Sequence, residues 1–402
     1  MQITNSFGTF LVALVSANLA TSAILPDRQG AHSGTFHVET APNPKFTGFN
    51  GPAALAKAYA KYGVPVSAKL RAAVELAKTN NPTARSTGSA PATPDGGDLE
   101  YLVPVQIGTP AQTLNLDFDT GSSDLWVFSS ELASSSRTGH DIYTASKSST
   151  AKKLSGYTWS ISYGDGSNSS GDVYDDKVTI GGLSVAKQAV EAAQKASAQF
   201  VQGANDCLVG LAFSSINTVS PRQQLTWFDN IKSSLDKPLF TADLRKGQVG
   251  SYLFGGIPSA ARSVSYAPVD SSQGFWSFST SVEGVGSFDT IADTGTTLVL
   301  GTDDLVNAYY GDVESAVYSD EQQGVLVDCD ADLPDFTFTV GSGSISVPGS
   351  YVNYAEVGNG QCYGGIQSAG DIPFSIFGDI ALKAAYVVFD AGQTRVGWAQ
   401  KA

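Results

Sequence analysis

One short motif occurs twice in this chain, as Asp119-Thr120-Gly121-Ser122 and again as Asp293-Thr294-Gly295-Thr296. An apolar stretch precedes each Asp and another follows each hydroxyl residue, so each copy is typical of a strand that runs into a tight turn. A second repeated segment follows each copy at a similar spacing, first Val209-Gly210-Leu211-Ala212 and then Phe377-Gly378-Asp379-Ile380. Repetition on this scale predicts two similar lobes, each of which supplies one carboxylate.

The chain after residue 100 is predicted to be mainly β. Gly accounts for 42 of the 402 residues and charged residues for only 15%, which suits short strands and turns better than long helices. Helical spacing is limited there to two short stretches, 225–235 and 303–310. Alternation of apolar and polar residues predicts strands at 101–107, 113–118, 158–163, 173–180, 335–340 and 386–390.

The N-terminal residues resemble a secretory signal peptide over 1–23, with an apolar stretch at 10–15 and small residues up to Ala23. No Lys or Arg precedes the apolar stretch, so a disordered or anchored N-terminus is the alternative. No later apolar run has the length of a membrane helix, and the sequence predicts a secreted, soluble protein. A leader, defined as residues 24–85, contains two helical patterns, at 53–62 and 67–78, and a polar linker follows it.

Charge is divided unevenly between the leader and the body of the chain. Residues 1–85 contain 8 Lys and Arg against 3 Asp and Glu, although the whole chain has a net charge of -14. So acidic a body makes nucleic acid an improbable partner. The acidity either keeps a secreted protein soluble or adapts it to acid surroundings, and the sequence leaves both interpretations open.

Three cysteines occur in the chain, so at most two of them can pair with each other in an oxidising compartment. We expect a disulfide between Cys329 and Cys362, which flank a compact Gly-rich stretch. Cys207 lies in an apolar run and is expected to be a buried, inert thiol.

Most catalytic chemistries are excluded by what the body of the chain lacks. His140 is its only histidine, so a zinc site with two His ligands cannot form, and a Ser-His-Asp or Cys-His site would have to use this one residue. The body has no GxSxG nucleophile elbow, and neither a P-loop nor a dinucleotide-binding fingerprint is present. No metal or cofactor is expected.

The paired Asp residues remain as the candidate catalytic groups. Two carboxyl groups held close together do not both ionise readily, so Asp119 and Asp293 are expected to share one proton at acidic pH. One could then act as a base on a water while the other donates to a carbonyl oxygen. Gly121 and Gly295 would let the backbone approach the carboxylates, and the hydroxyls of Ser122 and Thr296 would hold them further.

These motifs resemble those of the pepsin-like aspartic proteases, and most closely those of the secreted fungal members. The segments 117–127 and 291–297 are similar to the two active-site loops of that family, and the resemblance covers residues 86–402. It implies a bilobal β fold with a cleft, a first lobe at 86–265 and a second at 266–402. A carboxyl pair that shares a proton is itself a known property of this family.

The resemblance also implies which residues bind substrate. The segment 160–167 is similar to the flap, a hairpin that closes over the substrate, although a simple Gly-rich hairpin turn would look the same. Trp126 would support the flap tyrosine. Asp165 could also admit a Lys before the cut bond. Substrate contacts carried over from the family are those of Tyr163, Gly164, Asp165, Ser167, Phe200, Leu208 and Thr297.

By the same resemblance the leader is an inhibitory prosegment. Lys61-Tyr62 matches the pair that lies against the catalytic carboxylates, and Lys57-Ala58-Tyr59 is a competing candidate. Acid is expected to weaken the hold of the prosegment, with cleavage near 81–86. The family also implies a monomer that acts on proteins and peptides and binds pepstatin-type inhibitors.

The sequence therefore predicts a secreted aspartic endopeptidase made as a zymogen, which cuts at acidic pH beside large hydrophobic residues. The alternative is a catalytically inactive relative that binds peptides or glycans. One departure from the family pattern stands out: Asp206-Cys207 replaces the usual Asp-Gly, and Cys does not adopt every backbone conformation open to Gly.

Overall fold

The computed structural model describes residues 34–42, 48–80, 101–162, 167–201 and 207–402. Several of the predicted features lie outside these described residues. They are the signal peptide at 1–23, the cleavage region at 81–86, the flap residues Tyr163, Gly164 and Asp165, and Asp206.

An eight-stranded sheet holds the first Asp-Thr-Gly motif. Asp119 is the last residue of β4, and the short strand β5 begins after the turn. Strand β9 lies between these two strands, parallel to β4 and antiparallel to β5. The sheet order is β2 (Ala41–Pro42), β3 (Tyr101–Ile107), β4 (Gln112–Asp119), β9 (Cys207–Gly210), β5 (Leu125–Val127), β8 (Leu183–Ala196), β7 (Asn168–Ile180) and β6 (Lys152–Ser162).

A five-stranded sheet holds the second motif with the same local topology. Strand β23 is parallel to β14, which ends just before Asp293, and antiparallel to β15, which follows the turn. The second repeated segment of each half begins in these central strands, β9 and β23, so the predicted duplication is present in the sheet topology. The sheet order is β13 (Ser277–Val282), β14 (Gly286–Ala292), β23 (Ser375–Phe377), β15 (Val299–Gly301) and β22 (Ile366–Ser368).

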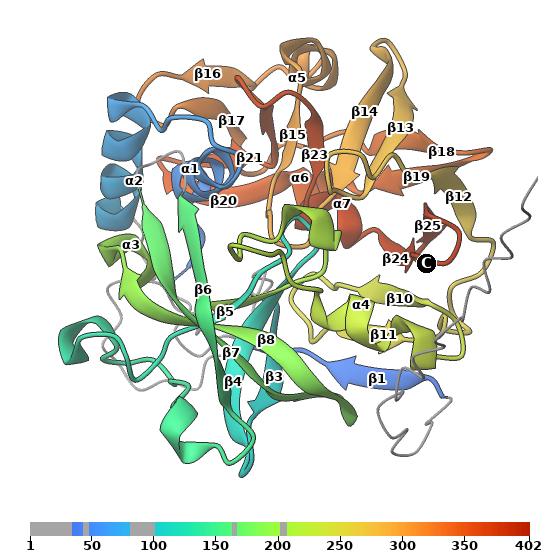
Figure 1. Ribbon diagram of the computed structural model, residues 1–402. Coiled ribbons are helices and arrows are strands. Elements are labelled where there is room, and N and C mark those ends of the chain that lie inside the picture. Colours follow the sequence, from blue (N-terminus) through green and yellow to red (C-terminus); the bar gives the residue numbers. More distant parts are fainter. Residues whose placement is uncertain (1–33, 43–47, 81–100, 163–166, 202–206) are drawn as a thin grey trace, which may run out of the picture. The chain divides into compact units, whose positions relative to one another are not determined.

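A six-stranded sheet is built from both halves of the chain and from the leader (Figure 1). Its leader strand β1 lies at the edge, antiparallel to β11. Phe118, the residue before Asp119, packs on Tyr252 of this sheet with ring centroids 4.9 Å apart, so the sheet supports the first motif from behind. Its order is β1 (Phe36–Glu39), β11 (Ser251–Phe254), β10 (Leu239–Asp243), β24 (Ala385–Asp390), β25 (Arg395–Gln400) and β12 (Ser265–Pro268), and the expected lobe boundary after residue 265 falls within β12.

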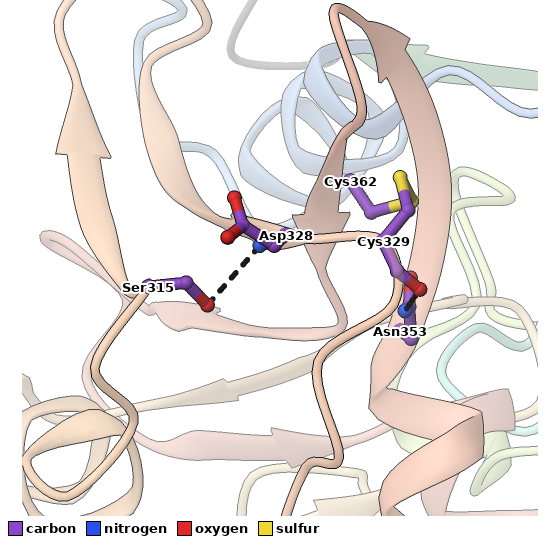
Figure 2. The surroundings of a disulfide bond; sticks show 5 residues. All are labelled: Ser315, Asp328, Cys329, Asn353 and Cys362. Carbon is purple, nitrogen blue, oxygen red and sulfur yellow. Dashed lines mark hydrogen bonds between the residues drawn. A yellow bond between two sulfur atoms is a disulfide. The ribbon is translucent and has the colours of Figure 1, made fainter.

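Two smaller sheets complete the second half, and a disulfide braces one of them. Cys329 and Cys362 are joined, with their Cα atoms 4.9 Å apart, and Figure 2 shows Asn353 beside them, donating to the Cys329 carbonyl at 2.7 Å. The disulfide links the residue after β17 to β21. The sheets are β16 (Val317–Ser319), β17 (Gly324–Asp328), β21 (Gln361–Gly364) with β20 (Asn353–Gly358), and β18 (Phe336–Val340) with β19 (Gly343–Val347).

The longest helices of the described chain lie in the leader, where the sequence predicts them. α1 (Gly51–Lys61) begins at the N-cap Asn50, and α2 (Ala68–Asn80) packs beside β20 (Figure 1). The helix predicted at 225–235 is shorter than expected, because Thr226 caps α4 (Trp227–Ile231) and a 3-10 turn follows at Lys232–Ser234. The remaining helices are α3 (Ala198–Val201), α5 (Asp303–Tyr310), α6 (Gly349–Val352) and α7 (Asp379–Leu382).

Candidate active site

The two Asp-Thr-Gly loops hold their carboxylates in the same way. In the first loop, Asp119 Oδ1 accepts from the backbone N–H of Gly121 at 2.8 Å and Oδ2 accepts from Ser122 Oγ at 2.7 Å. In the second, Asp293 Oδ1 accepts from Gly295 N–H at 2.9 Å and Oδ2 from Thr296 Oγ1 at 2.5 Å. Each carboxylate is thus fixed in orientation by one amide and one hydroxyl, the bonds that the motif predicts.

The two threonines of the motifs bond across from one loop to the other, a contact that sequence reasoning missed. Thr120 N–H donates to Thr294 Oγ1 at 3.1 Å, and Thr294 N–H donates to Thr120 Oγ1 at 3.0 Å. Each hydroxyl then donates to a carbonyl of the opposite half, those of Ala292 and Phe118. The only signal in the sequence is the Thr common to both motifs.

Gly121 and Gly295 are required by close packing. A Cβ on Gly121 would lie 2.6 Å from Asp293 Oδ1, and a Cβ on Gly295 would lie 2.3 Å from Asp119 Oδ1. Side chains at either position would push the two carboxylates apart. The glycines therefore allow the two Asp side chains to approach each other.

Lys61 of the leader lies between the two carboxylates. Its Nζ is 2.7 Å from Asp119 Oδ1 and 2.8 Å from Asp293 Oδ2, and both Asp residues are almost fully buried, with exposures of 4% and 0%. The same Nζ also lies 2.9 Å from Asp293 Oδ1. One ammonium group thus neutralises two carboxylates that are close enough to share it.

Tyr62 completes this contact from the end of α1. Its hydroxyl donates to Asp293 Oδ2 at 2.6 Å, and its ring packs edge-on against Phe275 and Phe374. Lys57 and Tyr59, the competing candidates from the sequence, contact other residues. Lys57 is half exposed, with its Nζ 4.0 Å from Asp117, and Tyr59 donates to the Ser368 carbonyl.

The charges explain the shifted pKa values of this cluster. Burial works against the charge of Lys61, but the two carboxylates outweigh it and raise the pKa of the ammonium group above its usual range. Burial would raise the pKa of Asp293, but the Lys61 charge and the hydrogen bonds from Lys61, Thr296 and Tyr62 lower it to about 2. Burial raises the pKa of Asp119 and the Asp293 charge adds to this, against the opposing effect of Lys61.

The remaining predicted site residues lie on neighbouring elements. Trp126 of β5 is buried and touches the ring of Phe200 on α3, with centroids 5.2 Å apart. Leu208 of β9 lies opposite Trp126 in the sheet. Ser167 is buried just before β7, and Thr297, next to the second loop, is half-buried and accepts from Ile380 N–H.

No cluster of three or more His, Cys, Asp or Glu side chains arranged to hold a metal ion occurs among the described residues. Within the described ranges, none of the helices is both long enough and apolar enough to cross a bilayer.

Residues 100–401 match the family model described as eukaryotic aspartyl protease. The chain belongs to the eukaryotic aspartyl protease family. It is 52% identical over 382 residues to endothiapepsin of Cryphonectria parasitica, covering 92% of this chain and 91% of that protein. It is also 53% identical over 364 residues to penicillopepsin-1 of Penicillium rubens, covering 88% of each.

A solved structure supports the same fold. The aspartic proteinase from Irpex lacteus matches with a TM-score of 0.63 at 24% identity, covering 75% of this chain and 94% of that one. Together with the family match, this makes the protein a pepsin-like aspartic endopeptidase with a bilobal, mainly β fold. Proteins are accordingly its class of substrate.

Proposed function

We propose that this aspartic endopeptidase is secreted as a zymogen and that Asp119 and Asp293 activate a water for attack on the peptide carbonyl. The observation that carries the proposal is the bridging of both carboxylates by one leader ammonium group, at 2.7 and 2.8 Å. A basic side chain in that position occupies the space that a water and the scissile carbonyl need. The leader must leave before catalysis can begin.

Once Lys61 has left, the two carboxylates face each other without a cation between them. Like charges at this range raise one of the two pKa values, so the pair holds one proton in acid. The ionised carboxylate takes a proton from the water, and the protonated one donates to the carbonyl oxygen. The hydroxyls of Ser122 and Thr296 keep both groups oriented through this exchange.

The proposal divides the chain into a signal peptide at 1–23, an inhibitory prosegment at 24–85, and two lobes at 86–265 and 266–402. Both lobes contribute strands to the six-stranded sheet, and the leader strand β1 pairs at its edge. Acidification removes the leader by protonating the carboxylates that hold Lys61, and cleavage near 81–86 releases it.

For substrate binding we propose a preference for large hydrophobic side chains around the cut bond. Phe200 and Leu208 would form apolar pocket walls, and the contact of Phe200 with the buried Trp126 supports this role. Tyr163, Gly164 and Asp165 would act from the flap, and Ser167 and Thr297 would contribute polar contacts. The resemblance to the family supports these assignments.

Haemoglobin digestion by the acid-treated protein tests this function. We expect pepstatin-sensitive activity at acidic pH, and we expect Asp119→Asn or Asp293→Asn to lower kcat by roughly 10²- to 10⁴-fold, since each removes one partner of the acid–base pair. Asp289→Asn is the matched control, because Asp289 lies on the same strand β14 but bonds only at the surface, to Ser279. Processed protein without pepstatin-sensitive activity would favour a peptide- or glycan-binding relative.

A further inference from the structure

Two further carboxyl groups are buried directly behind the first catalytic loop. Asp124 lies five residues after Asp119, just before β5, and Glu191 lies on the adjacent strand β8, where it pairs with Trp126. Both residues are only 1% exposed. A charged carboxylate in such a place is costly unless a cation or several donors compensate it.

The donors around these two groups are few and neutral. Asn217 Nδ2 donates to Asp124 Oδ1 at 2.8 Å and to Glu191 Oε1 at 2.9 Å, and Thr218 N–H donates to Asp124 Oδ1 at 2.8 Å. Glu191 Oε2 accepts no hydrogen bond from any described residue. The ion pairs found in the described part of the chain all involve other acids.

One proton shared by the two carboxyl groups would supply the missing hydrogen-bond donor. If Glu191 is protonated, its O–H becomes a donor to Asp124, and the pair carries one negative charge in place of two. The residues around the pair add no compensating positive charge. Asn217 and Thr218 are neutral, and the further titratable group that acts on Asp124 is Asp119. It is negative and disfavours a second charge.

We propose that Asp124 and Glu191 are positioning residues that hold the Asp119 loop in its catalytic geometry through a shared proton. The link to the loop is short. The amide of Asn217 that joins both carboxyl groups also donates to the Ser123 carbonyl at 3.3 Å, and Asp124 O accepts from Gly210 N–H in β9 at 2.8 Å. Loss of the proton would set two negative charges against each other and separate β8 from the loop.

The direction of the pKa shifts agrees with this arrangement. Burial raises the pKa of Asp124 to about 6 and, with the Asp124 charge, raises the pKa of Glu191 well above its ordinary value. Groups with raised folded-state pKa values contribute stability that is fully present below the ordinary carboxyl pKa. As the pH rises through about 6, Asp124 ionises and one proton remains on the pair. The stability that this proton supplies is lost as the pH rises further, through the raised pKa of Glu191.

Glu191→Gln tests the proposal because the amide N–H₂ supplies the donor permanently. Two quantities are measured between pH 4 and 8: the urea midpoint of the full chain, and kcat of the acid-processed enzyme at saturating peptide. We expect the variant to keep its acid activity within about twofold and to shift the alkaline loss of both quantities upward by at least one pH unit. A second variant, Asp124→Asn, should also shift the alkaline loss of both quantities upward. Glu283→Gln is the control, because Glu283 is an exposed carboxylate.

If the urea midpoint and kcat fell at the same alkaline pH in the wild type and in both variants, the two carboxyl groups would not share a proton. A shift in the urea midpoint without a shift in kcat would overturn the positioning role. The kcat measurement rests on the proposed function, whereas the urea measurement does not. Absence of pepstatin-sensitive activity in every protein would therefore reject the proposed function, while the urea data would still decide whether the proton is shared.

Discussion

Cys207 occupies a backbone conformation that suits glycine. It begins β9 with φ at +108° and is buried opposite Val127 of β5. This is the position at which the resemblance to the family implies a Gly, and the conformation is one that Gly adopts without strain. A side chain with positive φ of this kind costs on the order of 1–3 kcal/mol.

We therefore expect Cys207→Gly to be more stable than Cys207→Ala by about 1 kcal/mol, the relief of strain less the greater entropy of Gly in the unfolded chain. Both variants remove the thiol and differ only by the Cβ atom. Urea unfolding of the full chain measures the difference. An Ala variant as stable as the Gly variant would show that the Cys207 backbone is unstrained.

The bonds within each Asp-Thr-Gly loop could be predicted from the sequence, because the partners are two or three residues apart. The bonds between the loops could not. Thr120 and Thr294 meet only because both strands end at the same place in the fold, and a sequence pattern does not fix such a meeting. The same holds for Asp124 and Glu191, whose contact depends on the pairing of β5 with β8.

At the scale of elements, α3 is held in place by a residue far from it in sequence. His140 Nε2–H donates to the Val201 carbonyl at the end of α3 at 3.0 Å, and the His140 ring stacks on Phe128 with centroids 4.1 Å apart. Phe200, the residue before Val201, is the proposed pocket wall. His140 thus anchors the short helix that carries Phe200.

His140→Leu should raise KM several-fold for peptides with a large hydrophobic residue at this pocket, since one hydrogen bond contributes about 1 kcal/mol. Peptides with Ala at the same position should be affected less, and kcat should change little. His140→Gln retains an N–H donor and is the matched control, expected to recover part of the loss. Equal KM changes for both peptides would mean that His140 acts on the fold as a whole.

Period-two patterns predicted β3, β7 and β18, because each has one face in the core and one that is more exposed. The strand predicted at 386–390 is also present, as β24, but it is buried along nearly its whole length. The four-residue α3 is too short to show a helical period. The six-stranded sheet was not predictable either, since β1, β10 and β24 come from the leader and from both halves of the body. Only the fold brings these strands together.

At the scale of the whole molecule, the leader is held to the body by charge as well as by strand pairing. In the Lys61-bound state the pKa of Asp293 is lowered to about 2 from an ordinary 3.8. A lowered pKa means that this contribution to leader binding is complete above about pH 4 and is lost as the pH falls toward 2. Because the pKa of Asp119 is raised, the ion pair between Lys61 and Asp119 is lost at a higher pH than the pair between Lys61 and Asp293.

Lys61→Met should therefore be processed at a higher pH than the wild type. The Met side chain fills a similar space but leaves the two carboxylates without their cation, so acid is no longer needed to break an ion pair. We expect loss of the leader at least one pH unit higher, measured by mass spectrometry of the full chain incubated across pH 2–7. Lys57→Met removes a half-exposed Lys from the same helix and should leave the processing pH unchanged.

Two outcomes separate the role of Lys61 from other causes of processing. The double variant Lys61→Met with Asp119→Asn should remain intact at every pH if the enzyme cleaves its own leader, whereas its processing would point to another protease. A processing pH that is equal in the wild type and the Lys61→Met variant would show that strand β1 and the aromatic contacts of Tyr62 hold the leader without help from the ion pairs. A shift that Lys57→Met reproduces would assign the effect to the net charge of the leader, because the two substitutions remove the same charge and differ in whether it lies between the catalytic carboxylates.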